Sequence, residues 1–214
     1  AALQELIRRT ITEHKRIIFN GNNYSDEWVE EAQRRGLLNL KTTVDALPSF
    51  IAEKNVKLFT KHKIFTVSEL HSRYEILMDA YSKKLNIEAL TMIDMARKQI
   101  LPAVESYAAK LAETLARSAL DKKALAADLA CDWETQTVRE LSDCLSALHK
   151  SLGKLETHLH KAQRLSDVTQ QGLYYKDTIL RDMAAVREKA DKAESLTAAE
   201  YWPFPSYTEL LYHN

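Results

Sequence analysis

Glycine and proline are scarce in this chain, with four of each among 214 residues. Average protein composition would supply roughly two to three times as many of both residues. Because glycine and proline punctuate most turns, their scarcity predicts few turns and long secondary-structure elements. Alanine, leucine, lysine, glutamate and arginine are plentiful, which indicates that these elements are helices. No segment shows the alternation of a half-buried strand, so we predict an all-α fold.

An excess of charge of either sign is also lacking, because 30 basic residues balance 30 acidic ones. A nucleic-acid-binding protein usually carries a basic excess, so we expect no nucleic-acid partner. Apolar runs long enough to span a bilayer are missing, and the helices lack the basic polar face of a membrane-lying helix, so we expect no membrane partner. No signal-peptide pattern appears, which favours a cytoplasmic location.

Cysteine is limited to Cys131 and Cys144, which lie thirteen residues apart on one predicted helix. This spacing corresponds to about 20 Å along a helix, which is too far for a disulfide bond. Two reduced thiols, buried or half-buried, are therefore expected, as suits a cytosolic protein.

The chain begins without a methionine, at Ala1, and its first residues already follow a helical pattern. Leu3, Ile7 and Ile11 recur at every fourth position. We therefore expect a segment of a longer protein, with removal of an initiator methionine as the alternative.

Turn and capping signals divide residues 1–66 into short helices and connections. We expect a first helix up to about Ile18, ended by the cluster Asn20 to Tyr24. Ser25 is a candidate N-cap for a helix over 26–35, and Gly36 is its candidate C-cap. Pro48 indicates a turn or a helix start, and the stretch 52–63 indicates one more short helix.

A bundle of long helices is predicted over residues 67–196. Thr66 and Glu69 form a capping-box pattern that begins it, and Pro102 should kink or break its first helix near 98–101. We expect turns near 118–122 and 165–172, so the helices would pack antiparallel. The first apolar seam with heptad spacing comprises Val138, Leu141, Leu145, Leu148, Leu152, Leu155 and Leu159. The second comprises Ile179, Met183, Val186, Ala190 and Ala193.

The C-terminal residues 197–214 differ from the rest because Trp202-Pro203-Phe204-Pro205 is incompatible with a helix. Five aromatic residues between Tyr201 and Tyr212 would form a costly exposed patch in a free tail. We therefore expect this tail to pack on the bundle or on a neighbouring chain, and all three regions to form one structural domain.

The strongest candidate for a ligand site is the turn Asn20 to Tyr24, because free amides at the helix that follows could hold an anion. The chain lacks both GxGxxG and GxxxxGK[ST], however, and Asn and Gly are the residues that tolerate left-handed backbone. We therefore interpret the cluster as a turn between two helices.

Metal and catalytic sites are not indicated. His158 and His160 are two residues apart and point to different faces of a helix, and neither HExxH nor ExxH occurs. His14, His62 and His71 are expected at the surface. The cysteines form no CxxC, and the carboxylates alternate with Lys and Arg as on a solvated helix face. We predict no catalytic, cofactor-binding or metal-binding residue in this chain.

Several distinctive strings allow a more specific interpretation. The strings "NGNNYSDEWVEEA", "LHSRYEILMDAY" and "NIEALTMIDMARKQILPAV" fall within residues 14–107, and "EYWPFPSYTELLY" covers 200–212. These strings resemble the C-terminal region of type III glutamine synthetases. Residues 108–172 match that region in helical character rather than in distinctive strings.

The resemblance implies a parent enzyme that joins glutamate and ammonia, using ATP and Mg or Mn, through a γ-glutamyl phosphate. It also implies that the catalytic residues belong to an upstream domain built of strands, so none of them transfers to a position in this chain. The leading hypothesis is a non-catalytic helical domain that packs on its own catalytic domain and on neighbouring subunits of a homo-oligomer.

Three alternatives stay open at this point. The chain could be a regulatory or partner-docking module of the same enzyme, or a stand-alone coiled-coil adaptor. In a further alternative, the turn Asn20 to Tyr24 reaches back to the active site of the full enzyme and helps to close it.

Overall fold

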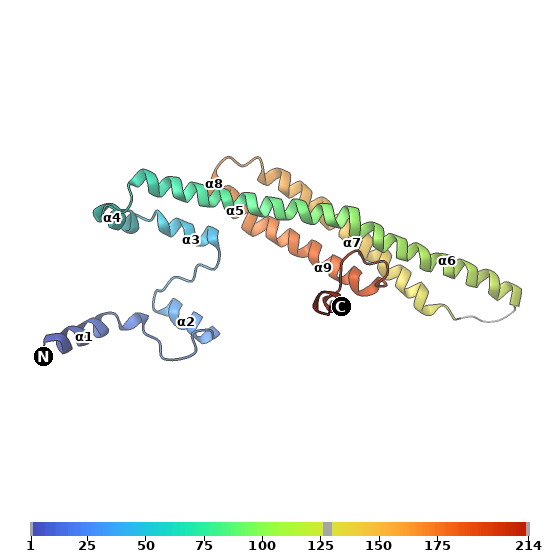
Figure 1. Cartoon of the computed structure of the whole chain (residues 1–214), viewed down its shortest axis with the longest axis horizontal. Coiled ribbons are helices and arrows are strands. Elements are labelled where there is room, and N and C mark those ends of the chain that lie inside the picture. Colours follow the sequence, from blue (N-terminus) through green and yellow to red (C-terminus); the bar gives the residue numbers. More distant parts are fainter. Residues whose placement is uncertain (1, 126–129, 213–214) are drawn as a thin grey trace.

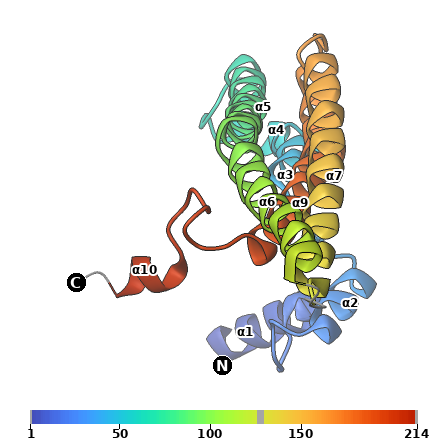
Figure 2. The same cartoon turned by 90° about the vertical axis from the view of Figure 1, so that its right-hand side faces the viewer.

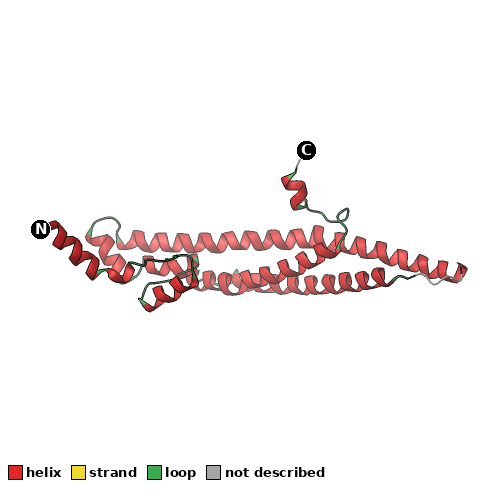
Figure 3. Cartoon of the chain, turned by 90° about the horizontal axis from the view of Figure 1, so that it is seen from below, coloured by secondary structure: helices red, strands yellow, loops and turns green. Residues whose placement is uncertain are grey.

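The computed structural model describes residues 2–125 and 130–212. Within these ranges every regular element is helical, which confirms the predicted all-α fold (Figure 3). The long helices run side by side as an elongated bundle, and the short N-terminal helices lie towards one end of it (Figure 1). No helix in the described ranges is long and apolar enough to cross a membrane.

The first two helices are joined by a compact turn. Helix α1 (Ala2–Glu13) ends earlier than predicted and is followed by a 3-10 turn at Lys15–Ile17. Helix α2 (Asp26–Arg34) lies where the sequence placed it. Gly36 ends it with φ +75°, while the amides of Gly36 and Leu37 donate to the carbonyls of Gln33 and Ala32 at 3.0 and 2.9 Å. This pairing is the Schellman motif, for which glycine is favoured.

The prediction for Pro48 was wrong, because this residue lies inside helix α3 (Thr43–Phe50). The helix begins instead at Thr42, whose Oγ1 accepts a hydrogen bond from the Asp45 amide at 3.2 Å. A proline late in so short a helix removes a single intrahelical bond, and the cap at the other end defines the start. Helix α4 (Glu53–Lys61) follows and confirms the short helix predicted for that stretch.

Helix α5 (Val67–Met95) begins at the predicted capping box. The Glu69 amide donates to Thr66 Oγ1 at 3.3 Å, and Glu69 Oε2 accepts from the Thr66 amide at 2.7 Å. The chain then passes through a π-helical turn, Ala96–Ile100, into helix α6 (Leu101–Leu125). The predicted break near 98–101 does not occur, because the widened turn at this position accommodates the missing amide donor of Pro102.

The chain returns along α6 in helix α7 (Asp132–Ala162) and reverses again into α8 (Val168–Tyr174). A second π-helical turn, Tyr175–Ile179, leads into α9 (Leu180–Leu196), which packs along α7. The predicted antiparallel arrangement of α5 to α9 is therefore confirmed (Figure 1).

Both predicted turns need correction. Residues 118–122 are helical, so the first reversal follows Leu125, and part of it falls outside the described residues. The second reversal is shorter than predicted, and Gly172 lies inside α8. A Cβ atom at Gly172 would come within 3.4 Å of both Met78 and Val44, so this glycine allows α8 to pack closely on α5 and α3.

The core lies along the two predicted seams. Most members of both seams are buried, and only Val138, Leu145 and Met183 are half-buried. Leu148, Leu152 and Leu155 are completely inaccessible, and they share one cluster with Val104 and Ile179 from the neighbouring elements. The heptad spacing therefore predicted correctly which sides of α7 and α9 face the interior.

The C-terminal tail packs on the bundle only in part. Trp202 and Phe204 pack against the main core cluster, and the ring centroids of Tyr201 and Tyr107 are 5.3 Å apart. The short helix α10 (Tyr207–Leu211) then leads away from the bundle (Figure 2). Leu211 and Tyr212 are exposed there, so the predicted packing holds for the first half of the tail.

Candidate docking surface

Helix α5 is apolar on two opposite sides. Its inner side is buried in the bundle and comprises Leu70, Tyr74, Met78, Leu85, Ala89 and Ile93. Its side away from the bundle carries large exposed side chains, which we call the outer face of α5: Ile76, Ile87 and Leu90. Ile76 is 62% exposed and Ile87 is 63% exposed. Large apolar side chains exposed on one side of a helix are typical of a contact surface.

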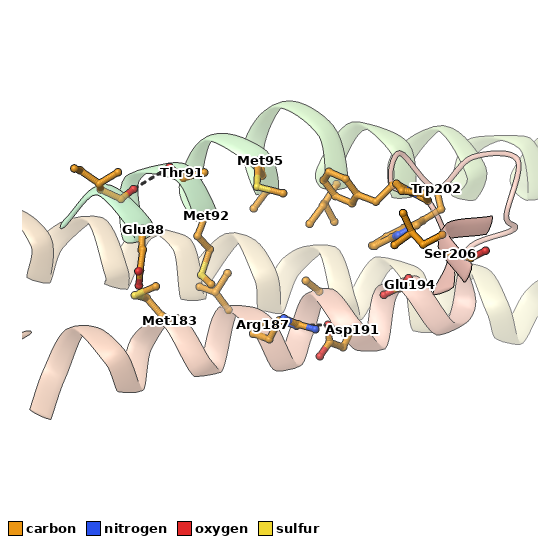
Figure 4. Close-up of a pocket in the computed structure, with 18 residues that line it drawn as sticks. Glu88, Thr91, Met92, Met95, Met183, Arg187, Asp191, Glu194, Trp202 and Ser206 are labelled. Carbon is orange, nitrogen blue, oxygen red and sulfur yellow. Dashed lines mark hydrogen bonds and ion pairs between the residues drawn. The ribbon is translucent and has the colours of Figure 1, made fainter. Parts of the chain in front are cut away.

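An apolar groove lies beside the outer face, between α5 and α9, and the tail closes one end of it (Figure 4). Its volume is ≈ 630 Å³. The large apolar side chains that line it are Ile87, Met92, Met95, Ile100, Met183, Val186, Trp202, Phe204 and Leu210. Methionine side chains adapt their shape readily, so they are suited to receive apolar groups of different shapes.

The rim of this groove is mostly acidic. Glu88 extends from α5 towards α9, and Asp191 and Glu194 line the opposite side (Figure 4). One basic group, Arg187, donates from Nε to Oδ1 of Asp191 at 2.7 Å. The groove thus offers an apolar floor with a negatively charged border, which suits the apolar side of a helix with basic flanks.

The described lining of the groove combines apolar side chains with a few acidic and basic ones. Among its described lining residues there is neither a histidine nor a cysteine. Over residues 2–125 and 130–212, no three side chains of His, Cys, Asp or Glu come together in a way that could hold a metal ion. The arrangement can bind an apolar surface, and we assign it no chemical step.

The predicted turn Asn20 to Tyr24 lies between α1 and α2, apart from helices α5 and α9, which form the groove (Figure 1). Asn22 Oδ1 accepts from the Tyr24 amide at 3.0 Å, and Ser25 Oγ donates to the Asn22 carbonyl at 2.8 Å. Ser25 precedes α2 as predicted, but its hydroxyl bonds back to the turn instead of capping the helix. Local bonds of this kind are typical of Asx turns.

Three side chains hold this joint together. Phe19 stacks on Trp28 with ring centroids 4.5 Å apart, and Arg35 lies 5.9 Å from the centre of each ring. Arg35 Nη1 also donates to the Ile18 carbonyl at 2.5 Å. These contacts fix the direction in which the chain enters α2.

The histidines and cysteines lie apart from the groove. His14, His62 and His71 are exposed, as predicted. Cys144 is buried in α7, and burial raises the pKa of its thiol. Cys131 is half-buried and directly precedes α7, so the two cysteines do not share one helix as predicted.

A buried carboxylate, Asp182, was not predicted from the sequence, and its side chain is only 2% exposed. His158 Nδ1 donates a hydrogen bond to it, and Lys154 Nζ lies 3.2 Å from its Oδ1. Both partners come from α7, so this cluster joins α7 to α9. The signal was present in the sequence, because Asp182 is three residues after Ile179 and four before Val186, both in the second seam.

The described residues thus form an all-helical bundle with an exposed apolar surface. Residues 2–119 match the family model of the glutamine synthetase C-terminal domain, so the chain belongs to this family. The resemblance seen in the distinctive strings is thereby confirmed.

Three relatives have similar sequences over almost the whole chain. Glutamine synthetase of Butyrivibrio fibrisolvens is 39% identical over 210 residues, which cover 98% of this chain and 29% of the relative. Type-3 glutamine synthetase of Dictyostelium discoideum is 29% identical over 211 residues, covering 99% of this chain. Glutamine synthetase of Bacteroides fragilis (strain YCH46) is 27% identical over 216 residues. The chain spans 29% of the length of each of these relatives.

Proposed function

We propose that this chain is a non-catalytic C-terminal domain of a glutamine synthetase, and that it supports the packing of subunits into a homo-oligomer in the cytoplasm. The ATP-dependent joining of glutamate and ammonia, with its Mg or Mn, would then belong to a catalytic domain outside these residues. The partners of the bundle would be that catalytic domain and the neighbouring subunits.

The observation that carries this proposal is the outer face of α5. Burial of a large aliphatic side chain contributes about 1.5–3 kcal/mol, so a face of three such residues favours association. Helix α1 adds a second exposed apolar stripe, because Leu3, Ile7 and Ile11 are exposed and none of its residues is buried. This stripe favours a contact between α1 and the catalytic domain.

The proposal is tested by placing charges on the outer face in the full-length protein. The double substitution Ile87→Asp with Leu90→Asp should reduce the mass of the assembly, because a carboxylate is costly to bury in an apolar contact. The matched control is Leu120→Asp on α6, at a leucine that is 70% exposed and lies outside the outer face.

Mass is measured by light scattering after size-exclusion chromatography, and circular dichroism checks that each variant is folded. If the double variant keeps the mass and the dilution behaviour of the unsubstituted protein, the outer face has no part in assembly.

A second candidate function is favoured by the groove between α5 and α9. Its volume of ≈ 630 Å³ and its Met and Trp lining suit a protein segment or a small apolar effector that controls the enzyme. The variant Met183→Glu should then change the control of activity while the mass of the assembly stays the same. A variant that leaves both the activity and its response to nitrogen supply unchanged would count against this function.

A further inference from the structure

Helix α5 and the π-helical turn that follows it carry two copies of the same charge pattern, one on each side of Glu88 and Ala89. Asp79 and Lys83 form an ion pair at 2.7 Å near the middle of α5. Asp94, near the end of α5, and Lys98, in the π-helical turn, form the equivalent ion pair. Lys83 and Lys98 are each 73% exposed, and Asp79 and Asp94 are 43% and 54% exposed.

The residues between these pairs follow the spacing of a coiled-coil seam. The seam positions, separated alternately by four and three residues, are Ile76, Ala80, Lys83, Ile87, Leu90 and Asp94. Every one of them is exposed. A seam of this spacing keeps one side of a helix in contact with a partner helix over its length, here about 27 Å between the first and last positions.

We propose that the outer face of α5 packs against the outer face of α5 in a second copy of this chain. The two helices run antiparallel about a twofold axis that passes between Glu88 and Ala89. This inference rests on the proposed role in assembly and names the partner for one surface.

The charges and apolar side chains select this register. With the axis between residues 88 and 89, Lys83 faces Asp94 of the second copy, and Asp79 faces Lys98. Ile87 then faces Leu90 twice, so the centre of the contact is apolar. An isologous contact of this kind is the commonest way in which identical chains pair.

Other registers lose the pairing of opposite charges. A shift of the pairing by one heptad in one direction puts Lys83 opposite Ile87, and a shift in the other direction puts Leu90 opposite Asp94. A parallel pair in register puts Lys83 opposite Lys83, and Asp94 opposite Asp94. In the two shifted registers a charged side chain loses its solvent against an apolar one without gaining a partner. In the parallel pair like charges meet across the interface, which opposes association. All these arrangements are therefore disfavoured.

The test uses two single variants of the full-length protein, Lys83→Glu and Asp94→Lys. Each variant alone places like charges opposite each other across the proposed axis. Each should therefore raise the concentration at which the assembly dissociates by about tenfold. A mixture of the two variants places opposite charges together at both sites, so mixing should restore assembly with heterotypic pairing.

The matched controls are Lys57→Glu and Glu53→Lys on α4. They break an ion pair of the same i,i+4 type, in which Lys57 is 74% exposed, and they lie outside the outer face. Analytical ultracentrifugation over a dilution series and native mass spectrometry of mass-tagged copies measure dissociation and pairing. The controls should dissociate as the unsubstituted protein does.

Loss of assembly in both single variants, with recovery on mixing, supports the antiparallel pair. If the single variants assemble as the unsubstituted protein does, or if mixing fails to restore them, the self-pairing is wrong. The proposed role in assembly would survive either result, since it is decided by the apolar substitutions at Ile87 and Leu90.

Discussion

Asp182 and His158 meet between α7 and α9. We expect the loss of one or the other side chain to destabilise the bundle unequally. The Asp182 carboxylate is 2% exposed, whereas the His158 side chain that bonds to it is 27% exposed. An ionised group without a partner is costly in the interior, but an apolar replacement of similar size avoids that cost. The substitution His158→Ala should therefore destabilise the bundle more than Asp182→Leu does.

The size of the stability loss in His158→Ala depends on Lys154, the partner of Asp182 that remains. Removing one partner of a fully buried ion pair typically costs about 3–5 kcal/mol. Lys154 stays 3.2 Å from Asp182 after His158→Ala, but it is 59% exposed and only partly compensates. We expect a loss of about 2 kcal/mol for His158→Ala and a change within about 1 kcal/mol for Asp182→Leu.

The assay is unfolding of the chain by urea, monitored by circular dichroism. The free energy of unfolding is compared between variants whose unfolding has the same dependence on urea concentration. His160→Ala is the matched control, because His160 is exposed on the same helix and should change stability by less than about 0.5 kcal/mol. A larger loss for Asp182→Leu than for His158→Ala would refute the argument from desolvation.

Three further predictions concern other parts of the chain. Asn23→Ala in the full-length enzyme should leave kcat and KM unchanged, because we interpret its turn as a joint; a clear change in either constant would assign the turn to the active site. Hydrogen bonds from Lys176 and then Thr42 lower the pKa of Asp45 from its ordinary value of 3.8. This stabilisation is present above about pH 4 and is lost as pH falls through the lowered pKa. Hydrogen exchange of the α3 amides should therefore become faster in acid. The substitution Asp45→Asn should remove this dependence of hydrogen exchange on pH. Burial raises the pKa of the Cys144 thiol, so it should react with a thiol reagent at pH 8 far more slowly in the folded chain than in denaturant; equal rates would contradict the burial.

Local chemistry made much of the fold predictable. The capping box at Thr66 and Glu69 involves residues close in sequence, and so does the Schellman motif at Gly36; their patterns are therefore visible without tertiary contacts. The heptad spacing through Leu148 and Leu152 likewise reports which side of a helix is buried, because the period of the helix is known.

Other features depend on contacts that are distant in sequence. Gly172 was expected in a turn, but it lies inside α8, where it allows close packing on Val44 and Met78. Its spacing from Ile179 and Val186 places Asp182 beside the buried seam, but its pairing with His158 required the relative register of α7 and α9, which spacing within one helix does not contain. For the same reason the sequence did not predict the outer face of α5, because spacing along one helix does not show which of its apolar sides a neighbouring helix covers.

The division of the chain at residues 66 and 196 stays a prediction, as does the absence of catalytic and metal-binding residues. Contacts do cross the first boundary, because Lys176 Nζ donates to Asp45 Oδ1 at 2.7 Å and joins α3 to the bundle. The bundle and the short helices before it are therefore connected by at least one ion pair with side chains that are less than one-third exposed.

The most direct test of the account is the mass of the assembly formed by the full-length protein without residues 67–212. Light scattering after size-exclusion chromatography gives this mass, and a coupled assay of glutamine formation reports on the remaining catalytic part. The account predicts a smaller assembly, because the outer face of α5 is removed together with the bundle. An assembly of unchanged size and full activity would contradict it.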